Sequence, residues 1–333
     1  MNSFLEKMVV VEMAYYYPGP YCCKILSELG ARVLKIEPPS GDPMRYQKSI
    51  FAGINAGKEL INLNLKEGED RNTLYKIVEN ADVFVEGFRP GVAERLGVDY
   101  PALKNINEGL IYCSITGFGQ NSGITRPVHD INVLSMAGIC EISGLLHKHP
   151  CDPNVQLSDF ASSVMAAVSI LAAYIRKIKT GKGAYIDISM YDSAIFSIPL
   201  HILKAANESK FMPDFHLNPG YRIYRARDCY VSIGILDEPV FWERLCDMLG
   251  LEIYRNISFE ERIKMAEEIE NKIAEKLSGM NRDQIVKLFN EDIPYGILTN
   301  IDEVAENSGV IREVEFQGRT VKTVSFPATF LLG

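Results

Sequence analysis

Several patterns that would point directly to a function are missing from this 333-residue chain. Its seven cysteines form no CxxC pair and are odd in number, which argues against a zinc site and against a disulfide framework. The five histidines are scattered and none stands in an HExxH motif, so we expect no metal site. Unpaired cysteines are typical of the cytoplasm, and we expect a cytoplasmic protein.

The chain also lacks a net positive charge and long hydrophobic runs. The formal net charge is −8, whereas phosphate binding requires a basic face, so nucleic acid is not an expected partner. A few local Arg and Lys side chains could still hold a small anionic ligand. No apolar run without charges reaches the roughly 18 residues of a membrane span, and no secretory pattern opens the chain. We therefore expect no membrane association.

The first half of the chain contains an alternation of strand and helix patterns. Residues 8–13 (MVVVEM) indicate a strand, 18–30 (PGPYCCKILSELG) a helix bounded by proline and glycine, and 31–39 (ARVLKIEPP) a second strand. The alternation continues beyond this βαβ unit and predicts a parallel sheet covered by helices. No GxGxxG sequence follows the first strand, so the pattern does not indicate NAD.

The chain is too long for one ordinary core, and its pattern changes near its middle. We predict an α/β fold in which a Rossmann-like large domain with a parallel sheet spans residues 1–190. A polar, turn-rich linker over 191–217 leads to a smaller α+β domain over 218–305, and residues 306–333 return to the large domain. Apolar residues at helical spacing predict a long helix over Asp159–Lys179.

His129 and Asp130 stand side by side at the start of an apolar, helix-like run, HDINVLSMAGI. Taken alone, His129 is best interpreted as a helix-start or surface residue. Asp130 and Asp159 are both suited to cap the N-terminus of a helix. Serine or asparagine would cap a helix equally well, so two adjacent titratable groups also raise the hypothesis of a catalytic role.

Several segments together resemble the family III CoA-transferases, the CaiB/BaiF superfamily. They are PGPYCCKILSELGARVLKIEPPSGDPMR, NAGKELINLNLK, ADVFVEGFRPGVAERLG, LIYCSITGFGQ, TGKGAYIDISMYD and FWERLCDMLGL. HDIN at 129–132, LSDF at 157–160 and the Glu238–Pro239 pair are most similar to the α-methylacyl-CoA racemase branch. The resemblance implies an interlocked homodimer and an acyl-CoA substrate. It implies no separate cofactor, because coenzyme A is part of the substrate.

The resemblance implies racemisation of 2-methylacyl-CoA thioesters by 1,1-proton transfer through an enolate. His129 and Asp159 would be the two acid/base groups, one acting on each face of the α-carbon. Asp130 would shape the oxyanion site at the start of its helix, where backbone N–H groups are available. Glu238 would accept a hydrogen bond from the imidazole of His129 and raise its basicity.

Coenzyme A is anionic, so its phosphates require basic side chains. The resemblance assigns this role to Lys35 and Arg89, together with Lys58 and Arg45.

Two alternatives remain open. In a CoA-transferase, Asp130 would be the nucleophile that forms an acyl anhydride and then an enzyme–CoA thioester. In a CoA-binding protein without turnover, the thioester would bind and remain unchanged.

Overall fold

The computed structural model describes residues 4–145, 148–209 and 214–330. The chain divides into two compact units. Unit 1 consists of Met1–Ile198 and Ser308–Gly333, and unit 2 of Pro199–Asn307.

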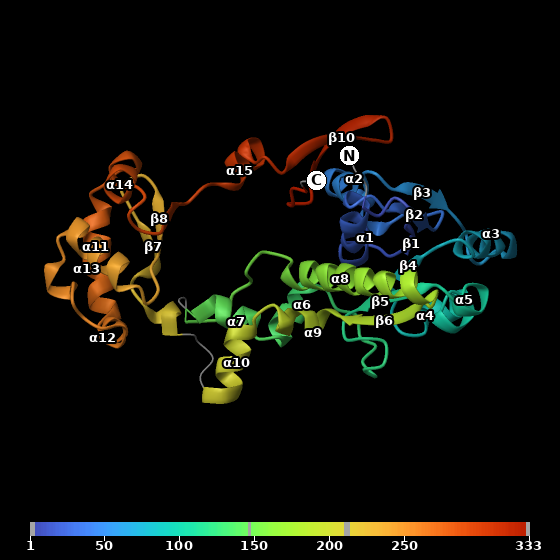
Figure 1. The fold of residues 1–333 in the computed structure, drawn as a ribbon, viewed down its shortest axis with the longest axis horizontal. Helices are drawn as coiled ribbons and strands as arrows, with labels where there is room; N and C mark the ends of the chain where they lie inside the picture. The colour runs from blue at the N-terminus through green and yellow to red at the C-terminus, as the bar shows by residue number, and fades with distance from the viewer. Residues whose placement is uncertain (1–3, 146–147, 210–213, 331–333) are drawn as a thin grey trace. The chain divides into compact units, whose positions relative to one another are not determined.

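Unit 1 is built on a six-stranded sheet in the order β3-β2-β1-β4-β5-β6 (Figure 1). Every pair of neighbouring strands is parallel, which confirms the predicted Rossmann-like α/β fold. The chain first builds the sheet from β1 towards β3 and then continues on the other side of β1 with β4, so the direction reverses between β1 and β4. The strands are β1 (Val9–Met13), β2 (Arg32–Glu37), β3 (Glu59–Asn62), β4 (Val83–Glu86), β5 (Ile111–Thr116) and β6 (Ala184–Ser189).

Helices cover both faces of this sheet because its central strands are apolar on both sides. All residues of β4 and β5 are buried. Residues of α1 and α8 pack in the core on one face, and residues of α3 and α5 pack in the core on the other. The helices of unit 1 are α1 (Pro18–Glu28), α2 (Lys48–Asn55), α3 (Gly68–Val78), α4 (Val92–Leu96), α5 (Tyr100–Ile106), α6 (Asp130–Met136), α7 (Ile139–Gly144), α8 (Leu157–Thr180) and α9 (Met190–Phe196).

The long helix expected over Asp159–Lys179 is α8, which begins two residues earlier, at Leu157. It ends at Gly181, whose φ of +70° is readily adopted by glycine, and two lysines lie in its last turn. Among the described residues, one helix is long and apolar enough to cross a membrane, and this helix is α8. Of its most apolar 18-residue window, 39% is buried inside the protein. Core helices have the same length and composition, and α8 packs against α1, β5 and β6.

The C-terminal part of unit 1 is an antiparallel hairpin of β10 (Ile311–Phe316) and β11 (Arg319–Val324). Two polar contacts fasten it to the N-terminal helices. The Thr323 hydroxyl donates to the carbonyl of Gly53 in α2 at 2.6 Å, and Arg312 pairs with Glu28 of α1 at 2.7 Å.

Unit 2 has its own core around the fully buried Trp242, formed between a small sheet and helices. The segment 191–217, expected to be a linker, contains most of α9, the helix α10 and a short 3-10 helix. The antiparallel strands are β7 (Tyr221–Arg225), β8 (Tyr230–Gly234) and β9 (Tyr295–Ile297). The helices are α10 (Pro199–Glu208), α11 (Pro239–Leu249), α12 (Phe259–Lys264), α13 (Ala266–Ser278), α14 (Arg282–Phe289) and α15 (Ile301–Asn307).

The interlocked dimer that the resemblance implies stays a prediction.

Candidate active site

A cavity of about 220 Å³ lies at the carboxyl ends of β1, β4 and β5. Its wall includes Tyr16 from the loop after β1, Arg89 from the loop after β4 and Phe118 from the loop after β5. His129 and Asp159 complete it. The cavity therefore lies where the strand order reverses, which is the position at which open α/β sheets bind their ligands.

His129 directly precedes α6 in an extended conformation, with φ −117° and ψ 173°. Its backbone N–H donates to Asn132 Oδ1 at 3.0 Å, which holds the first turn of the helix. The imidazole is exposed and stands nearly perpendicular to the ring of Tyr16, with 5.8 Å between centroids. Tyr16 has a φ of +62°, a left-handed conformation that costs a non-glycine residue about 1–3 kcal/mol. Backbone strain is thus stored beside the imidazole.

Asp130 was expected to cap its own helix or to act on the substrate, but its carboxylate reaches the start of another helix. Its Oδ1 accepts hydrogen bonds from the Ser158 N–H at 2.8 Å, the Ser158 hydroxyl at 2.5 Å and the Asp159 N–H at 3.0 Å. The Asp130 side chain is buried. These bonds satisfy N–H groups that the first turn of α8 leaves without helical partners. Asp130 therefore joins α6 to α8 and brings Asp159 to the cavity wall beside His129.

Asp159 lies in the first turn of α8 and is partly buried. Burial, and in second place the negative charge of Asp130, raise the pKa of its carboxyl group to about 7. Near neutral pH this carboxyl group is therefore present in both its protonated and its ionised form.

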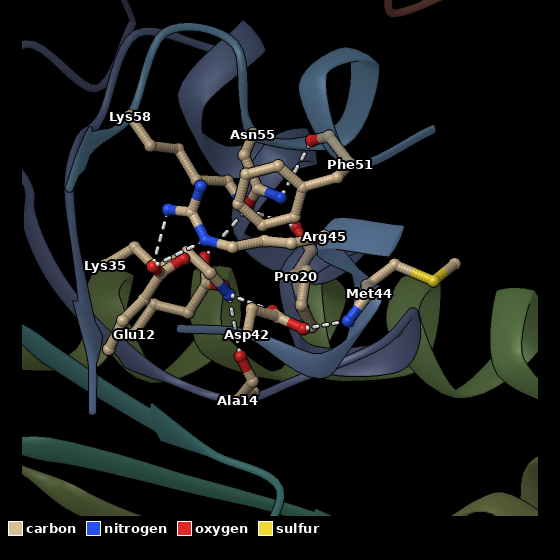
Figure 2. A network of polar contacts seen from close by, with 11 residues as sticks. Glu12, Ala14, Pro20, Lys35, Asp42, Met44, Arg45, Phe51, Asn55 and Lys58 are labelled. Carbon is tan, nitrogen blue, oxygen red and sulfur yellow. Dashed lines mark hydrogen bonds and ion pairs between the residues drawn. The ribbon is translucent and has the colours of Figure 1, made fainter. Parts of the chain in front are cut away.

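Lys35, predicted to bind a CoA phosphate, is fully buried in unit 1. Its ammonium nitrogen lies 2.7 Å from Glu12 Oε1, 2.8 Å from the carbonyl of Ala14 and 2.9 Å from Asp42 Oδ2 (Figure 2). A lysine ammonium has three N–H donors, and three protein oxygens surround this one. The phosphate contact stays a prediction, and the structure gives Lys35 a different set of partners.

Lys58 shares the same carboxylate. Its ammonium nitrogen lies 2.7 Å from Glu12 Oε2, 2.8 Å from the carbonyl of Pro20 and 2.9 Å from Asn55 Oδ1. Burial acts to raise the pKa of Glu12, but the two ammonium groups outweigh it and hold this pKa below its ordinary value. The charges of the two lysines are thus balanced by two buried carboxylates, those of Glu12 and Asp42, and neither lysine lines the cavity.

Arg45 pairs with Glu37 at 2.6 Å, and its guanidinium lies 4.3 Å from the centre of the Phe51 ring. Arg89 is exposed and lines the cavity. The structure describes all four residues predicted to bind CoA phosphates, and of these only Arg89 lies on the cavity wall.

Glu238 belongs to unit 2, where it precedes α11. Its Oε2 accepts a hydrogen bond from the Leu236 N–H at 2.7 Å. The predicted hydrogen bond from His129 would join the two units and stays a prediction. No group of three or more His, Cys, Asp or Glu side chains in the described part of the chain could hold a metal ion.

Sequence reasoning did not single out Tyr16, Arg126 or Glu86. Tyr16 and Arg126 line the cavity, and Glu86 is buried and accepts a hydrogen bond from Phe88 of its wall. A signal for Glu86 was present, because an acidic residue ends the otherwise apolar strand VFVE. For Tyr16 the three consecutive tyrosines before PGP gave no indication of a left-handed backbone.

Comparison with known proteins relates the chain to enzymes that act on CoA thioesters. The sequence model of the family described as "CoA-transferase family III" matches residues 5–331. Acetyl-CoA:oxalate CoA-transferase of Acetobacter aceti is 34% identical over 265 residues, which is 74% of this chain and 66% of that protein. Alpha-methylacyl-CoA racemase of Homo sapiens is 31% identical over 284 residues, 82% of this chain and 72% of the racemase.

Most of the other similar proteins carry CoA-transferase names. Among solved structures, a CaiB/BaiF family protein from Brucella suis matches with a TM-score of 0.86 and 27% identity. The match covers 99% of this chain and 93% of that one.

Proposed function

The chain belongs to CoA-transferase family III, and we propose that it racemises 2-methylacyl-CoA thioesters. The observation that carries this proposal is the placement of two different acid/base groups on one cavity. His129 exposes its imidazole there, and Asp159 contributes a carboxyl group whose pKa is raised to about 7. Inversion of a carbon centre by proton transfer needs two such groups, one on each face of that carbon.

In one direction the neutral imidazole of His129 takes the α-proton, and the C–H electron pair moves into the thioester as an enolate. The protonated carboxyl group of Asp159 then delivers a proton to the opposite face of the α-carbon. The reverse direction exchanges the two roles. A group that must alternately give and take a proton works best when its pKa lies near the working pH, as that of Asp159 does.

Backbone N–H groups at the start of α6 would stabilise the negative charge on the enolate oxygen. The side chain of Asp130 would act indirectly, because its Oδ1 is engaged with the first turn of α8. We therefore assign Asp130 to the placement of Asp159. Arg89 remains the candidate for a CoA phosphate on this cavity.

Transfer of CoA between an acyl-CoA and a free carboxylic acid is a second candidate, favoured by the names of most similar proteins. Asp159 would then be a better nucleophile than Asp130, because Asp159 lines the cavity whereas Asp130 is buried. Its carboxylate would attack the thioester carbonyl, releasing CoA thiolate and forming an acyl anhydride. The thiolate would then attack the Asp159 carbonyl, releasing the carboxylic acid and leaving an enzyme–CoA thioester. An acceptor acid reverses these two steps.

We also propose that the protein is a cytoplasmic homodimer and needs no cofactor beyond the CoA of its substrate. In a dimer, Glu238 of one chain could approach His129 of the other. Light scattering combined with size-exclusion chromatography tests the dimer, and a single-chain mass would contradict it.

The experiment that separates the two activities uses one epimer of a 2-methylacyl-CoA without any free acid. The racemase proposal predicts that chiral chromatography finds both epimers after incubation. A single unchanged epimer, followed by CoA transfer once a free carboxylic acid is added, would replace the proposal by the second candidate. Bound but unchanged thioester under both conditions would contradict both.

A further inference from the structure

A polar row crosses three neighbouring strands at the carboxyl end of the sheet. Glu86 at the end of β4 pairs in register with Ser114 of β5, and Ser114 pairs with Asp187 of β6. Residues in register on neighbouring strands project to the same face, so the three side chains stand next to one another. Glu86 and Ser114 are fully buried, and the proposed reaction uses none of the three.

Gln120, in the loop after β5, forms hydrogen bonds with all three residues of this row. Its side-chain amide nitrogen lies 2.9 Å from Ser114 Oγ, 3.2 Å from the carbonyl oxygen of Phe88 and 3.3 Å from Glu86 Oε1. Its backbone N–H donates to both oxygens of Asp187, at 2.9 and 3.0 Å. One residue thus links three strands to the loop that follows β4.

The backbone of Phe88 is held at both of its polar groups. Its N–H donates to Glu86 Oε2 at 2.6 Å, and its carbonyl accepts from Gln120. Arg89 is the next residue, and both Phe88 and Arg89 line the cavity. Phe118, two residues before Gln120, lines it as well. The network therefore determines where two loops of the cavity wall begin.

This arrangement has a cost. Glu86 accepts hydrogen bonds from neutral groups, the Phe88 N–H and the Gln120 amide, and burial raises the pKa of its carboxyl group to about 7. A buried carboxyl group without a cation weakens folding, whereas an apolar side chain at the end of β4 would not. Since Glu86 does not stabilise the fold, we look for its role in its contacts, and these hold Phe88 in the loop that carries Arg89.

We propose that Glu86 and Gln120 are positioning residues for acyl-CoA binding: by holding the backbone of Phe88, they keep Arg89 and the adjoining wall in the position that receives the CoA part of the substrate. Neither residue touches the reacting atoms. This proposal rests on the acyl-CoA site proposed above, and it adds which residues orient Arg89 in that site.

The test compares CoA affinity with turnover in Glu86→Ala and Gln120→Ala. Titration calorimetry gives the Kd of free CoA, and α-proton exchange of a 2-methylacyl-CoA gives kcat and KM. We expect Kd and KM to rise about tenfold, which is about 1.4 kcal/mol, while kcat changes by less than about threefold. Glu86→Gln keeps an oxygen acceptor for the Phe88 N–H and should bring Kd back to within about threefold of the wild type.

Asn107→Ala is the matched structural control. The Asn107 amide also bridges backbone carbonyls, those of Val78 and Ala81 at 2.9 Å each, and it does not line the cavity. It should lower the Tm and leave Kd unchanged. An unchanged Kd in folded Gln120→Ala, or an equal rise of Kd in Asn107→Ala, would overturn the proposal. If the wild type binds CoA but exchanges no proton, the racemase proposal fails while the Kd comparison still decides this one.

Discussion

Glu12 and Glu86 are two fully buried carboxyl groups on neighbouring strands of one sheet, and they show opposite electrostatics. Glu12 pairs in register with Val85, and Glu86 with Met13, so the two side chains leave the sheet on opposite faces. Two lysine ammonium groups surround Glu12, and its pKa is held below the ordinary value despite burial. Glu86 has neutral partners, and burial raises its pKa to about 7.

The difference shows that burial alone does not determine the charge of a carboxyl group; its cation partners do. Where the chain supplies cations, as at Glu12, the result is a neutral, closed network (Figure 2). Where it supplies none, as at Glu86 and Asp159, the carboxyl groups titrate near neutral pH. Asp159 lines the cavity, and Glu86 is hydrogen-bonded to Phe88 of its wall.

The largest effect is expected from removing the Glu12 carboxylate, which Lys35 and Lys58 share. Glu12→Gln would remove the carboxylate that the buried ammonium groups of Lys35 and Lys58 share, leaving Lys35 with Asp42 and Lys58 with uncharged oxygen partners. We expect a loss of about 3–5 kcal/mol in the free energy of unfolding, measured by denaturant titration. Glu59→Gln, which breaks an exposed pair with Arg32, is the control and should cost at most about 1 kcal/mol. Equal losses in both variants would contradict the account.

A second variant tests the uncompensated carboxyl group through pH. The folded-state pKa of Glu86 lies above the ordinary value of 4.5, so its favourable contribution is complete below pH 4.5 and is lost as pH rises through about 7. The loss amounts to about 3 kcal/mol, because one pKa unit corresponds to about 1.4 kcal/mol. The difference in unfolding free energy between Glu86→Gln and the wild type should therefore shift in favour of the variant by about 3 kcal/mol from pH 4.5 to pH 8.

The measurement is the free energy of unfolding of both proteins at the two pH values. Asp159 also titrates in this range, but it is present in both proteins and cancels in the difference. If the two proteins differ in unfolding free energy by the same amount at both pH values, Glu86 does not titrate as described.

The smallest of the three effects concerns the carboxylate that places Asp159. Asp130→Ala removes the acceptor of three hydrogen bonds at the start of α8 and should cost about 1–2 kcal/mol of unfolding free energy. Asp130→Asn keeps an oxygen acceptor and removes the negative charge, so it should cost less and lower the pKa of Asp159. Thermal unfolding and the pH–rate profile measure the two quantities. An unshifted profile in a folded Asp130→Asn protein would contradict this coupling.

Much of the fold followed from local patterns. Apolar strands such as VVVEM and VFVE, each followed by a helix, predicted the parallel sheet, and the spacing in Phe160–Ile175 predicted the long helix. These patterns are visible because a strand buried on both faces is a nearly continuous apolar run, interrupted here by Glu12 and Glu86. The turn-rich composition of 191–217 concealed α10, whose helical residues come before the polar part of that segment.

The site could be predicted less completely, because its roles depend on contacts across the chain. Nothing near Lys35 in the sequence shows that Glu12, 23 residues away, accepts a hydrogen bond from the Lys35 ammonium group. Asp130 bonds to residues 28 and 29 positions later, so a local capping rule named the right chemistry and the wrong helix. His129 and Asp159 could be paired because the resemblance supplied the long-range relation that spacing alone does not.

The proton-transfer roles of His129 and Asp159 can be tested by α-proton exchange of a 2-methylacyl-CoA in D2O, followed by NMR without any free acid. We expect loss of the α-proton signal with the wild type, and rates at least about a hundredfold lower with His129→Ala and Asp159→Asn. Glu141→Gln, an exposed acid on α7, should exchange at the wild-type rate. An α-proton signal that persists with folded wild-type protein and bound thioester would contradict the assignment of His129 and Asp159 as the two acid/base groups.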